Sequence, residues 1–245
     1  TIISMLKHPA DMTIEELTGN LERIHSFAQA IGAEFTGLAG QTPALITTKR
    51  ILRHSSFVLG AYGSVYTVRK NIEAFLRPDW IGLVGAGFLG RRVSRYLETS
   101  GYKILEYDPR IPGETRTPNH IRTANPSALI LCNLVVNLAS TGDSLAAIMP
   151  HLQNGVTILD DTHPRPTKPT IQMALEKGKL FWIGMRKNGV AIIPPFPGRP
   201  TEEIPGCLIE TILRAMGLRI SSQDEHDIAA EENDCKVFAQ EVVNV

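Results

Sequence analysis

The sequence is poor in cysteine and has no excess of charge of either sign. It contains three cysteines, at positions 132, 207 and 235, which are too few and too scattered for a disulfide framework or a zinc knuckle. Lysine and arginine together number 25, as do aspartate and glutamate, so no basic field would draw the chain to nucleic acid or an anionic membrane. The low cysteine content favours a reducing, cytoplasmic compartment.

Long apolar runs and internal repeats are also missing. No apolar run approaches the ~18 residues that suggest a membrane helix. The first residues, TIISMLKHPADMT, lack the charged start and long apolar core of a signal peptide. Hydrophobic residues make up 43% of the chain and charged residues 20%, a balance typical of a packed core. We therefore expect a cytoplasmic protein with no nucleic-acid or membrane partner.

Helical periodicity marks the N-terminal part of the chain. Thr13 and Glu16 form a capping-box pattern, apolar residues follow at helical spacing, and Gly32 stands where a C-terminal stop belongs. The same spacing predicts a second helix over 65–76. We expect the segment 1–78 to be a small, mainly helical substrate segment.

Predicted strands and helices alternate after this point. The strands lie in WIGLVG, YKILEYD, ALILCNLVVN, GVTILDD and LFWIG, and the helices in RRVSRYLETSG, DSLAAIMPHL and PTIQMALEKG. Such alternation predicts βαβ units, and hence an α/β fold with a doubly wound parallel sheet of the Rossmann type. We place this nucleotide-binding domain at 79–200. The remaining 201–245 are expected to form a helix and a solvated, helical acidic tail that pack back on the junction.

A G-x-G-x-x-G motif follows the first of these strands, in VGAGFLG. In this context Gly85 would make a tight turn, Gly87 would let the backbone approach a pyrophosphate, and Gly90 would let helix and strand pack closely. Phe88 and Leu89 open the helix, whose N–H groups and positive dipole end favour phosphate. The motif predicts a dinucleotide site; the alternative is that the glycines serve only a tight turn.

Asp108 ends the second strand, about 20 residues past the middle glycine, where a carboxylate binds the adenosine ribose of NAD. A carboxylate there repels the 2′-phosphate of NADP, whereas Arg110, two residues later, could attract it. The alternative role of Asp108 is that of a turn residue ahead of Pro109. We expect NAD or NADP as the coenzyme, with NAD preferred.

Two further segments should reach the carboxyl edge of the sheet, where ligands of such folds bind. VVNLAST carries three side chains that could line the nicotinamide ribose: Asn137, Ser140 and Thr141. Capping of the next helix by Ser140 or Asp143 is an equally good interpretation of this segment. ILDDTHPRPTK carries His163 on a loop stiffened by prolines, where an imidazole could serve as acid or base, although most loop histidines are merely solvated. Asp160 and Asp161 lack the partners of a metal site, so no metal is expected.

Cys207, in IPGCLIETILRAMG, lies in the first turn of a predicted helix. A thiol there feels unsatisfied N–H groups and the positive dipole end, which lower its pKa and suit a nucleophile. Free cysteine is also a common apolar filler, and the residues alone leave both interpretations open. The apolar face of this helix is expected to consist of Ile204, Leu208, Ile212 and Met216.

From about Thr47 to Arg219 the chain resembles the NAD(P)H-dependent long-chain acyl-[acyl carrier protein] reductases, a branch of the quinate/shikimate dehydrogenase-like group. GSVYTVRKNIEA and ILDDTHPRPTK resemble family segments, and IPGCLIETIL resembles the family's A-C-x-A-E-x-x-L helix. The resemblance implies that Cys207 carries the acyl group and that Glu210 takes the family's glutamate position. VVNLAS is also similar to the N-A-T-S stretch of shikimate dehydrogenases.

The sequence departs from that family in three respects. Its N-terminal part is shorter, its loop has G-A-G-F-L-G where the family usually has G-A-T-G-x-x-G, and Asp108 argues against the NADPH that the family favours. We therefore expect an oxidoreductase that reduces a small-molecule or carrier-bound acyl thioester, or a similar activated acid, to an aldehyde through Cys207.

Two alternatives stay open. The first is a non-covalent dehydrogenase of a small alcohol, ketone or imine, in which Lys49 or Lys70 would take the role of the shikimate dehydrogenase lysine. The second is a cofactor-binding regulatory protein with no chemistry of its own. The acyl group, the reaction direction and the oligomeric state are not determined by the pattern, and a homo-oligomer is compatible with it.

Overall fold

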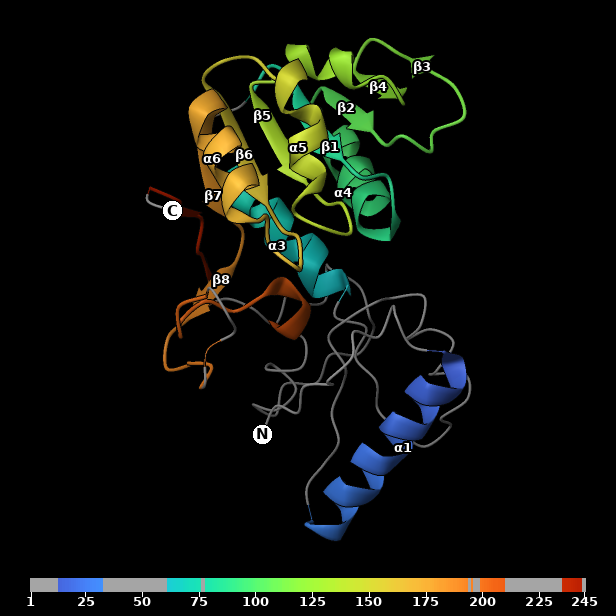
Figure 1. The fold of residues 1–245 in the computed structure, drawn as a ribbon, viewed down its shortest axis with the longest axis vertical. Helices are drawn as coiled ribbons and strands as arrows, with labels where there is room; N and C mark the ends of the chain where they lie inside the picture. Colours follow the sequence, from blue (N-terminus) through green and yellow to red (C-terminus); the bar gives the residue numbers. More distant parts are fainter. Residues whose placement is uncertain are drawn as a thin grey trace. The chain divides into compact units, whose positions relative to one another are not determined.

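The computed structural model describes residues 13–32, 61–75, 78–193, 195, 199–209 and 235–243 (Figure 1). Contacts divide the chain into two compact units. The first comprises Thr1–Tyr66 and Pro205–Asp234, and the second comprises Thr67–Ile204 and Cys235–Val245. The domain boundaries expected at 78 and 200 stay predictions.

The first unit contains the predicted N-terminal helix, α1 (Ile14–Ala30). Thr13 caps it: its hydroxyl accepts a hydrogen bond from the Glu16 N–H at 3.1 Å, and the Glu16 carboxylate accepts one from the Thr13 N–H at 2.8 Å. Gly32 follows the helix with a φ of +67°, a conformation that favours glycine. The expected capping box and stop are therefore confirmed.

The second predicted helix is α3 (Ala61–Glu73), which begins in the first unit and ends three residues earlier than expected. Its Gly63 allows a close backbone approach within the first unit, because a Cβ there would overlap the Gly206 carbonyl oxygen. Residues 206–209 are helical, which places Cys207 in a first turn, as expected. Ile204 was expected on that helix, but it forms an antiparallel β-bridge with Met185 in the second unit.

The second unit contains an eight-stranded sheet in the order β10-β7-β6-β5-β1-β2-β4-β3. Its strands are β1 (Ile81–Val84), β2 (Ile104–Tyr107), β3 (Thr115–Arg116), β4 (His120–Thr123), β5 (Leu134–Asn137), β6 (Val156–Asp160), β7 (Gly178–Trp182) and β10 (Gln240–Glu241). All neighbours are parallel except β3 on β4 and β10 on β7. The parallel strands have a doubly wound order, whose switch point lies between β1 and β5. The predicted Rossmann-type fold is confirmed.

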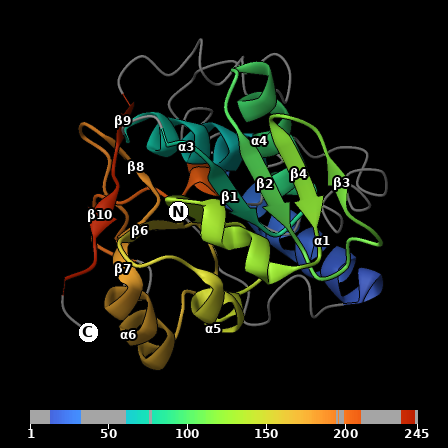
Figure 2. The same ribbon diagram turned by 90° about the horizontal axis from the view of Figure 1, so that it is seen from above.

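Helices cover both faces of this sheet. Figure 2 shows α3 and α4 (Phe88–Thr99) on one face, and α5 (Ser144–Ile148) and α6 (Lys168–Lys177) on the other. Every residue of β1, β2 and β5 is buried as a result, as expected of parallel strands covered on both sides. None of the helices in the described ranges is long and apolar enough to cross a membrane.

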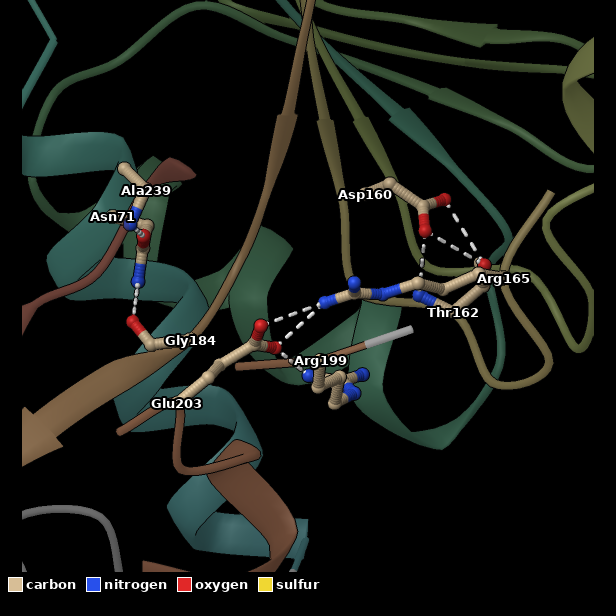
Figure 3. A network of polar contacts seen from close by, with 8 residues as sticks. All are labelled: Asn71, Asp160, Thr162, Arg165, Gly184, Arg199, Glu203 and Ala239. Atoms are coloured by element: carbon tan, nitrogen blue, oxygen red, sulfur yellow. Dashed lines mark hydrogen bonds and ion pairs between the residues drawn. The ribbon is translucent and has the colours of Figure 1, made fainter. Parts of the chain in front are cut away.

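The C-terminal residues differ from the prediction. The acidic tail was expected to be a solvated helix, but its described part forms β9 (Cys235–Val237), paired with β8 (Met185–Lys187), and β10, paired with the sheet edge. Asn71 of α3 holds this segment: its amide donates to the Gly184 carbonyl at 3.0 Å and accepts from the Ala239 N–H at 3.2 Å (Figure 3). The described C-terminal residues form strands because they pair with the open edges of β8 and β7. The local charge of the sequence does not reveal this pairing.

Candidate functional site

The three glycines of the loop between β1 and α4 meet different surroundings. Gly85 has a φ of +102°, and a Cβ there would lie 2.9 Å from the Leu138 carbonyl oxygen. A Cβ on Gly90 would overlap the Gly85 carbonyl oxygen. At Gly87 a Cβ would meet no atom of the described residues within 4 Å, so its backbone faces open space. The first glycine thus serves the turn, the third serves helix–strand packing, and the second leaves room for a ligand.

The start of α4 borders that open space. Gly87 is the N-cap residue and has no side chain with which to cap the helix. Phe88 and Leu89 follow in the first turn and are half-buried. Because N–H groups at a helix start lack intrahelical acceptors and carry partial positive charge, this turn can bind an anion.

Asp108 ties the end of β2 to the glycine loop. Its Oδ2 accepts a hydrogen bond from the Ala86 N–H at 3.0 Å, and its Oδ1 accepts one from the Arg110 N–H at 3.0 Å. The Arg110 guanidinium adds bonds of 2.9 and 2.8 Å to the two oxygens. These bonds, those of the Arg110 side chain above all, hold the pKa of Asp108 far below its ordinary value although burial opposes them. Asp108 is an ionised carboxylate that also serves its own turn.

The loops after β5 and β6 are joined to each other. The Asp161 N–H donates to the Asn137 carbonyl at 3.1 Å, and the Gly142 N–H donates to the Pro164 carbonyl at 3.0 Å. Asp143 does not cap α5 with its side chain; its carboxylate accepts hydrogen bonds from Thr167 and thereby holds the start of α6. The segments predicted to meet at the carboxyl edge of the sheet are neighbours.

The residues expected near a nicotinamide ribose differ in accessibility. Asn137 is fully buried, and its amide donates to the Asp160 Oδ1 at 2.8 Å, so in this structure it supports β6 and does not face a ligand. Ser140 is exposed and Thr141 is half-buried, so both are accessible. His163 is exposed on the loop after β6, where an acid or base would have to lie.

Asp160, the last residue of β6, and Asp161, which follows it, differ in the hydrogen bonds that their carboxyl groups accept. The Asp160 carboxylate accepts hydrogen bonds from the Thr162 hydroxyl at 3.0 and 2.9 Å (Figure 3). It also accepts the hydrogen bond from the Asn137 amide. Asp161 is half-buried, and no described residue donates a hydrogen bond to its carboxyl. Burial raises the pKa of Asp160 to about 6 and that of Asp161 to about 8.

Close to these aspartates, two arginines meet on one buried carboxylate. Arg165 Nη2 donates to both oxygens of Glu203, at 2.7 and 2.9 Å, and Arg199 donates to Glu203 Oε1 (Figure 3). Glu203 is fully buried, and the Arg165 guanidinium lies 4.4 Å from the centre of the Trp182 ring. Sequence reasoning missed Glu203 and Arg199 as partners of Arg165, because no local pattern links residues so far apart in the chain.

The remaining predicted residues lie elsewhere. Lys49 and Glu210 are outside the described residues, and Lys70 of α3 is bonded to Glu73 at 3.0 Å. Cys132 is buried, which raises the pKa of its thiol to about 12, in agreement with a core role. Cys207 is half-buried and belongs to the first unit, whereas the glycine loop belongs to the second, so its approach to a coenzyme stays a prediction. The described residues contain no cluster suited to a metal ion.

No protein-family model and no curated protein matches the chain. Among solved structures it is similar to L-tryptophan dehydrogenase from Nostoc punctiforme, with 16% identity, a TM-score of 0.48, and coverage of 92% of this chain and 64% of that one. It is also similar to quinate dehydrogenase from Corynebacterium glutamicum in complex with NAD, with 15% identity, a TM-score of 0.36 and coverage of 49% of each chain.

A third similar structure is D-lactate dehydrogenase from Aquifex aeolicus complexed with NAD and lactic acid, with 15% identity, a TM-score of 0.34, and coverage of 50% of this chain and 44% of that one. The chain thus covers 64%, 49% and 44% of the lengths of these three structures, less than two thirds in each case. Such low identities and TM-scores carry no argument about activity, which has to come from the site itself.

Proposed function

We propose that the chain is an NAD(P)-dependent oxidoreductase. The observation that carries this proposal is the division of roles among the loop glycines. Backbone atoms occupy the space that a Cβ would need at Gly85 and Gly90, whereas at Gly87, at the start of α4, no described atom occupies it. Asp108, at the end of β2, lies one hydrogen bond from the same loop, in the position suited to an adenosine ribose.

The residues present fit a dinucleotide. Asp108 would bind the ribose hydroxyls, the first turn of α4 would bind the pyrophosphate, and the other half of the molecule would extend over the ends of β5 and β6. Ser140 and Thr141 are accessible there and could bind its second ribose. When bound, the coenzyme would supply or accept a hydride.

Two glycine variants test coenzyme binding without disturbing the fold. Gly87→Ala adds a methyl group that touches no described atom, so we expect wild-type thermal unfolding but at least a ~10-fold weaker affinity for NADH or NADPH, because the methyl occupies the space of the pyrophosphate. Gly113→Ala, equally free of contacts, is the matched control and should bind normally. Equal binding by both variants, measured by coenzyme fluorescence, would contradict the proposal.

For the reaction, we propose reduction of an acyl thioester or similar activated acid to an aldehyde through Cys207. Support comes from the half-buried position of this thiol in the first turn of the helical residues 206–209, and from the resemblance of IPGCLIETIL to an acyl-carrying helix. The Cys207 thiolate would attack the carbonyl carbon and expel the carrier thiolate. Hydride delivery to the new thioester would then release the aldehyde and restore the Cys207 thiolate.

Intact-mass measurement tests this step. Wild-type protein incubated with acetyl-CoA and hexanoyl-CoA in the absence of reduced coenzyme should gain one acyl group, and Cys207→Ala should gain none. Cys235→Ala is the matched control, because Cys235 is also half-buried, and it should be labelled like the wild type. Turnover without labelling would instead favour a non-covalent dehydrogenase, and labelling of Cys207→Ala would show that Cys207 is not the acylated residue.

A further inference from the structure

The backbone of Asp161 is held by a hydrogen bond, whereas its carboxyl accepts none from the described residues. Its N–H donates to the Asn137 carbonyl on β5 at 3.1 Å, one residue beyond the Asn137–Asp160 pair that ends the β5–β6 register. The residue therefore lies at the carboxyl edge of the sheet. Its side chain is half-buried, and within the described ranges no group donates a hydrogen bond to its carboxyl.

The neighbouring Asp160 shows what a structural carboxylate at this edge looks like. Asp160 receives hydrogen bonds from Asn137 and Thr162, and it is nearly inaccessible. Among the described residues, none donates a comparable hydrogen bond to Asp161, so the described part of the chain does not explain an acid at this position by hydrogen bonding. A partly desolvated carboxyl without partners is costly when ionised, which suits a group that exchanges a proton.

The charges around Asp161 come from three segments. Asp160 on β6 and Glu203 on the segment 199–204 disfavour its ionisation, while Arg199 on that segment and Arg165 on the loop after β6 favour it. Both arginines are already bound to Glu203, which limits their effect on Asp161. Burial outweighs them and leaves the acid neutral at pH 7.

The position of Asp161 relative to the coenzyme follows from the strand order. Asp108 at the end of β2 marks the adenosine side and the glycine loop after β1 marks the pyrophosphate, so the nicotinamide half extends toward β5 and β6. We propose that Asp161 lies at the nicotinamide end of the site and is the proton donor and acceptor of the reaction. This inference rests on the proposed oxidoreductase function.

The proton balance assigns a role to each form of Asp161. Reduction of a thioester by hydride consumes one proton: as the carbon–sulfur bond to the carrier breaks, the Asp161 O–H bond breaks and its proton forms the S–H bond of the departing thiol. Asp161 is left as a carboxylate while the oxidised nicotinamide carries a positive charge, and solvent restores the proton. The ionised form of Asp161 therefore favours binding of the oxidised coenzyme, whose nicotinamide ring is positively charged. The neutral form of Asp161 accompanies the reduced coenzyme, whose nicotinamide ring is uncharged.

Coenzyme binding alone tests this coupling. We expect the Kd of wild-type protein for NAD⁺ to fall about 10-fold as the pH rises from 6.5 to 9. If the positive nicotinamide ring lowers the pKa of Asp161 by about one unit, ionisation of Asp161 must strengthen NAD⁺ binding by the same factor of about 10. The Kd for NADH should change less than about 2-fold, because its nicotinamide ring is neutral. Calorimetry in two buffers of different ionisation enthalpy should show proton release on NAD⁺ binding near pH 7.5.

Asp161→Asn should abolish both the pH dependence and the proton release while still binding NAD⁺, and Asp79→Asn, which removes an exposed aspartate, should keep both. Wild-type behaviour in Asp161→Asn would overturn the inference and leave the oxidoreductase proposal standing, as would pH-independent NAD⁺ binding by the wild type. Absence of binding by NAD⁺, NADH, NADP⁺ and NADPH would overturn the proposed function itself. Thermal unfolding verifies each fold, and Asp161→Ser replaces Asp161→Asn if the latter does not fold.

Discussion

Aspartates stand near the ends of two parallel strands at the same edge of the sheet, yet their chemistry differs. Asp108, after β2, is held ionised by Arg110 and by the Ala86 N–H, which keep its pKa far below the ordinary value. At Asp161, after β6, no described residue donates such a hydrogen bond to the carboxyl, and burial raises its pKa to about 8. The sheet edge supplies the positions, but the groups around each carboxyl decide whether it binds as an anion or exchanges a proton.

The two regions are also built differently. The region after β1 and β2 relies on backbone: glycines that tolerate close contacts, and N–H groups at a helix start. The region after β6 relies on side chains from separate segments, above all Arg165 and Arg199 on Glu203 (Figure 3). Substitutions should therefore have different consequences in the two regions.

The largest effect is expected for Glu203→Ala. The change leaves two largely buried guanidinium groups without their shared carboxylate, so we expect a loss of about 3–5 kcal/mol in the free energy of unfolding. At this chain length that corresponds to a fall of roughly 10 °C in Tm, measurable by circular dichroism. Glu202→Ala removes the neighbouring exposed carboxylate and should leave Tm unchanged. If both variants melt alike, the buried network does not stabilise this region.

A smaller effect, of opposite sign, is expected for Asp161→Asn. Because the folded-state pKa is raised, ionisation of Asp161 opposes folding: the cost is absent below the unfolded-state pKa of about 4, grows as the pH rises, and is complete above pH 8. The variant should therefore melt at least ~3 °C above the wild type at pH 8.5 and equally at pH 4. Asp79→Asn should show no such gain. An advantage that is independent of pH would show that ionisation is not its cause.

The smallest effect in free energy concerns coenzyme choice. Asp108→Asn removes the negative charge that repels a 2′-phosphate and releases Arg110 to bind it, so the ratio of NADPH to NADH affinity should rise about 10-fold, or ~1.4 kcal/mol. Glu114→Gln, on the loop between β2 and β3, is the control and should leave the ratio unchanged. An unchanged ratio in Asp108→Asn would place the adenosine ribose away from this carboxylate.

Much of the fold could be predicted because its signals are local. The capping box at Thr13, the helix stop at Gly32 and the alternation of apolar strands with amphipathic helices each depend on neighbouring residues, and the structure confirms them. The short strands β3 and β4 lack such a signal and were missed. The strands formed by 235–237 and 240–241 were mistaken for a helix, because their structure depends on the open edges of β7 and β8.

For the candidate site, the glycine loop, Asp108 and the segments after β5 and β6 could be found from spacing alone. The sequence could not predict whether each of these side chains faces a ligand. Asn137 was expected at a ribose and is buried against Asp160, whereas Asp161 was considered only as a metal ligand. Burial and unfilled hydrogen bonds arise from the packing of distant segments, which no local pattern records.

The amino-acid sequence by itself determined the alternation of strands and helices, the three glycines and the carboxylate about 20 residues beyond them, because backbone conformation and apolar periodicity act over a few residues. Only the tertiary structure decided that Glu203 gathers two arginines, that Asp108 is ionised and that Asp161 is neutral. A carboxyl group's charge depends on what desolvates and contacts it, and the folded chain brings those groups together from segments far apart in sequence.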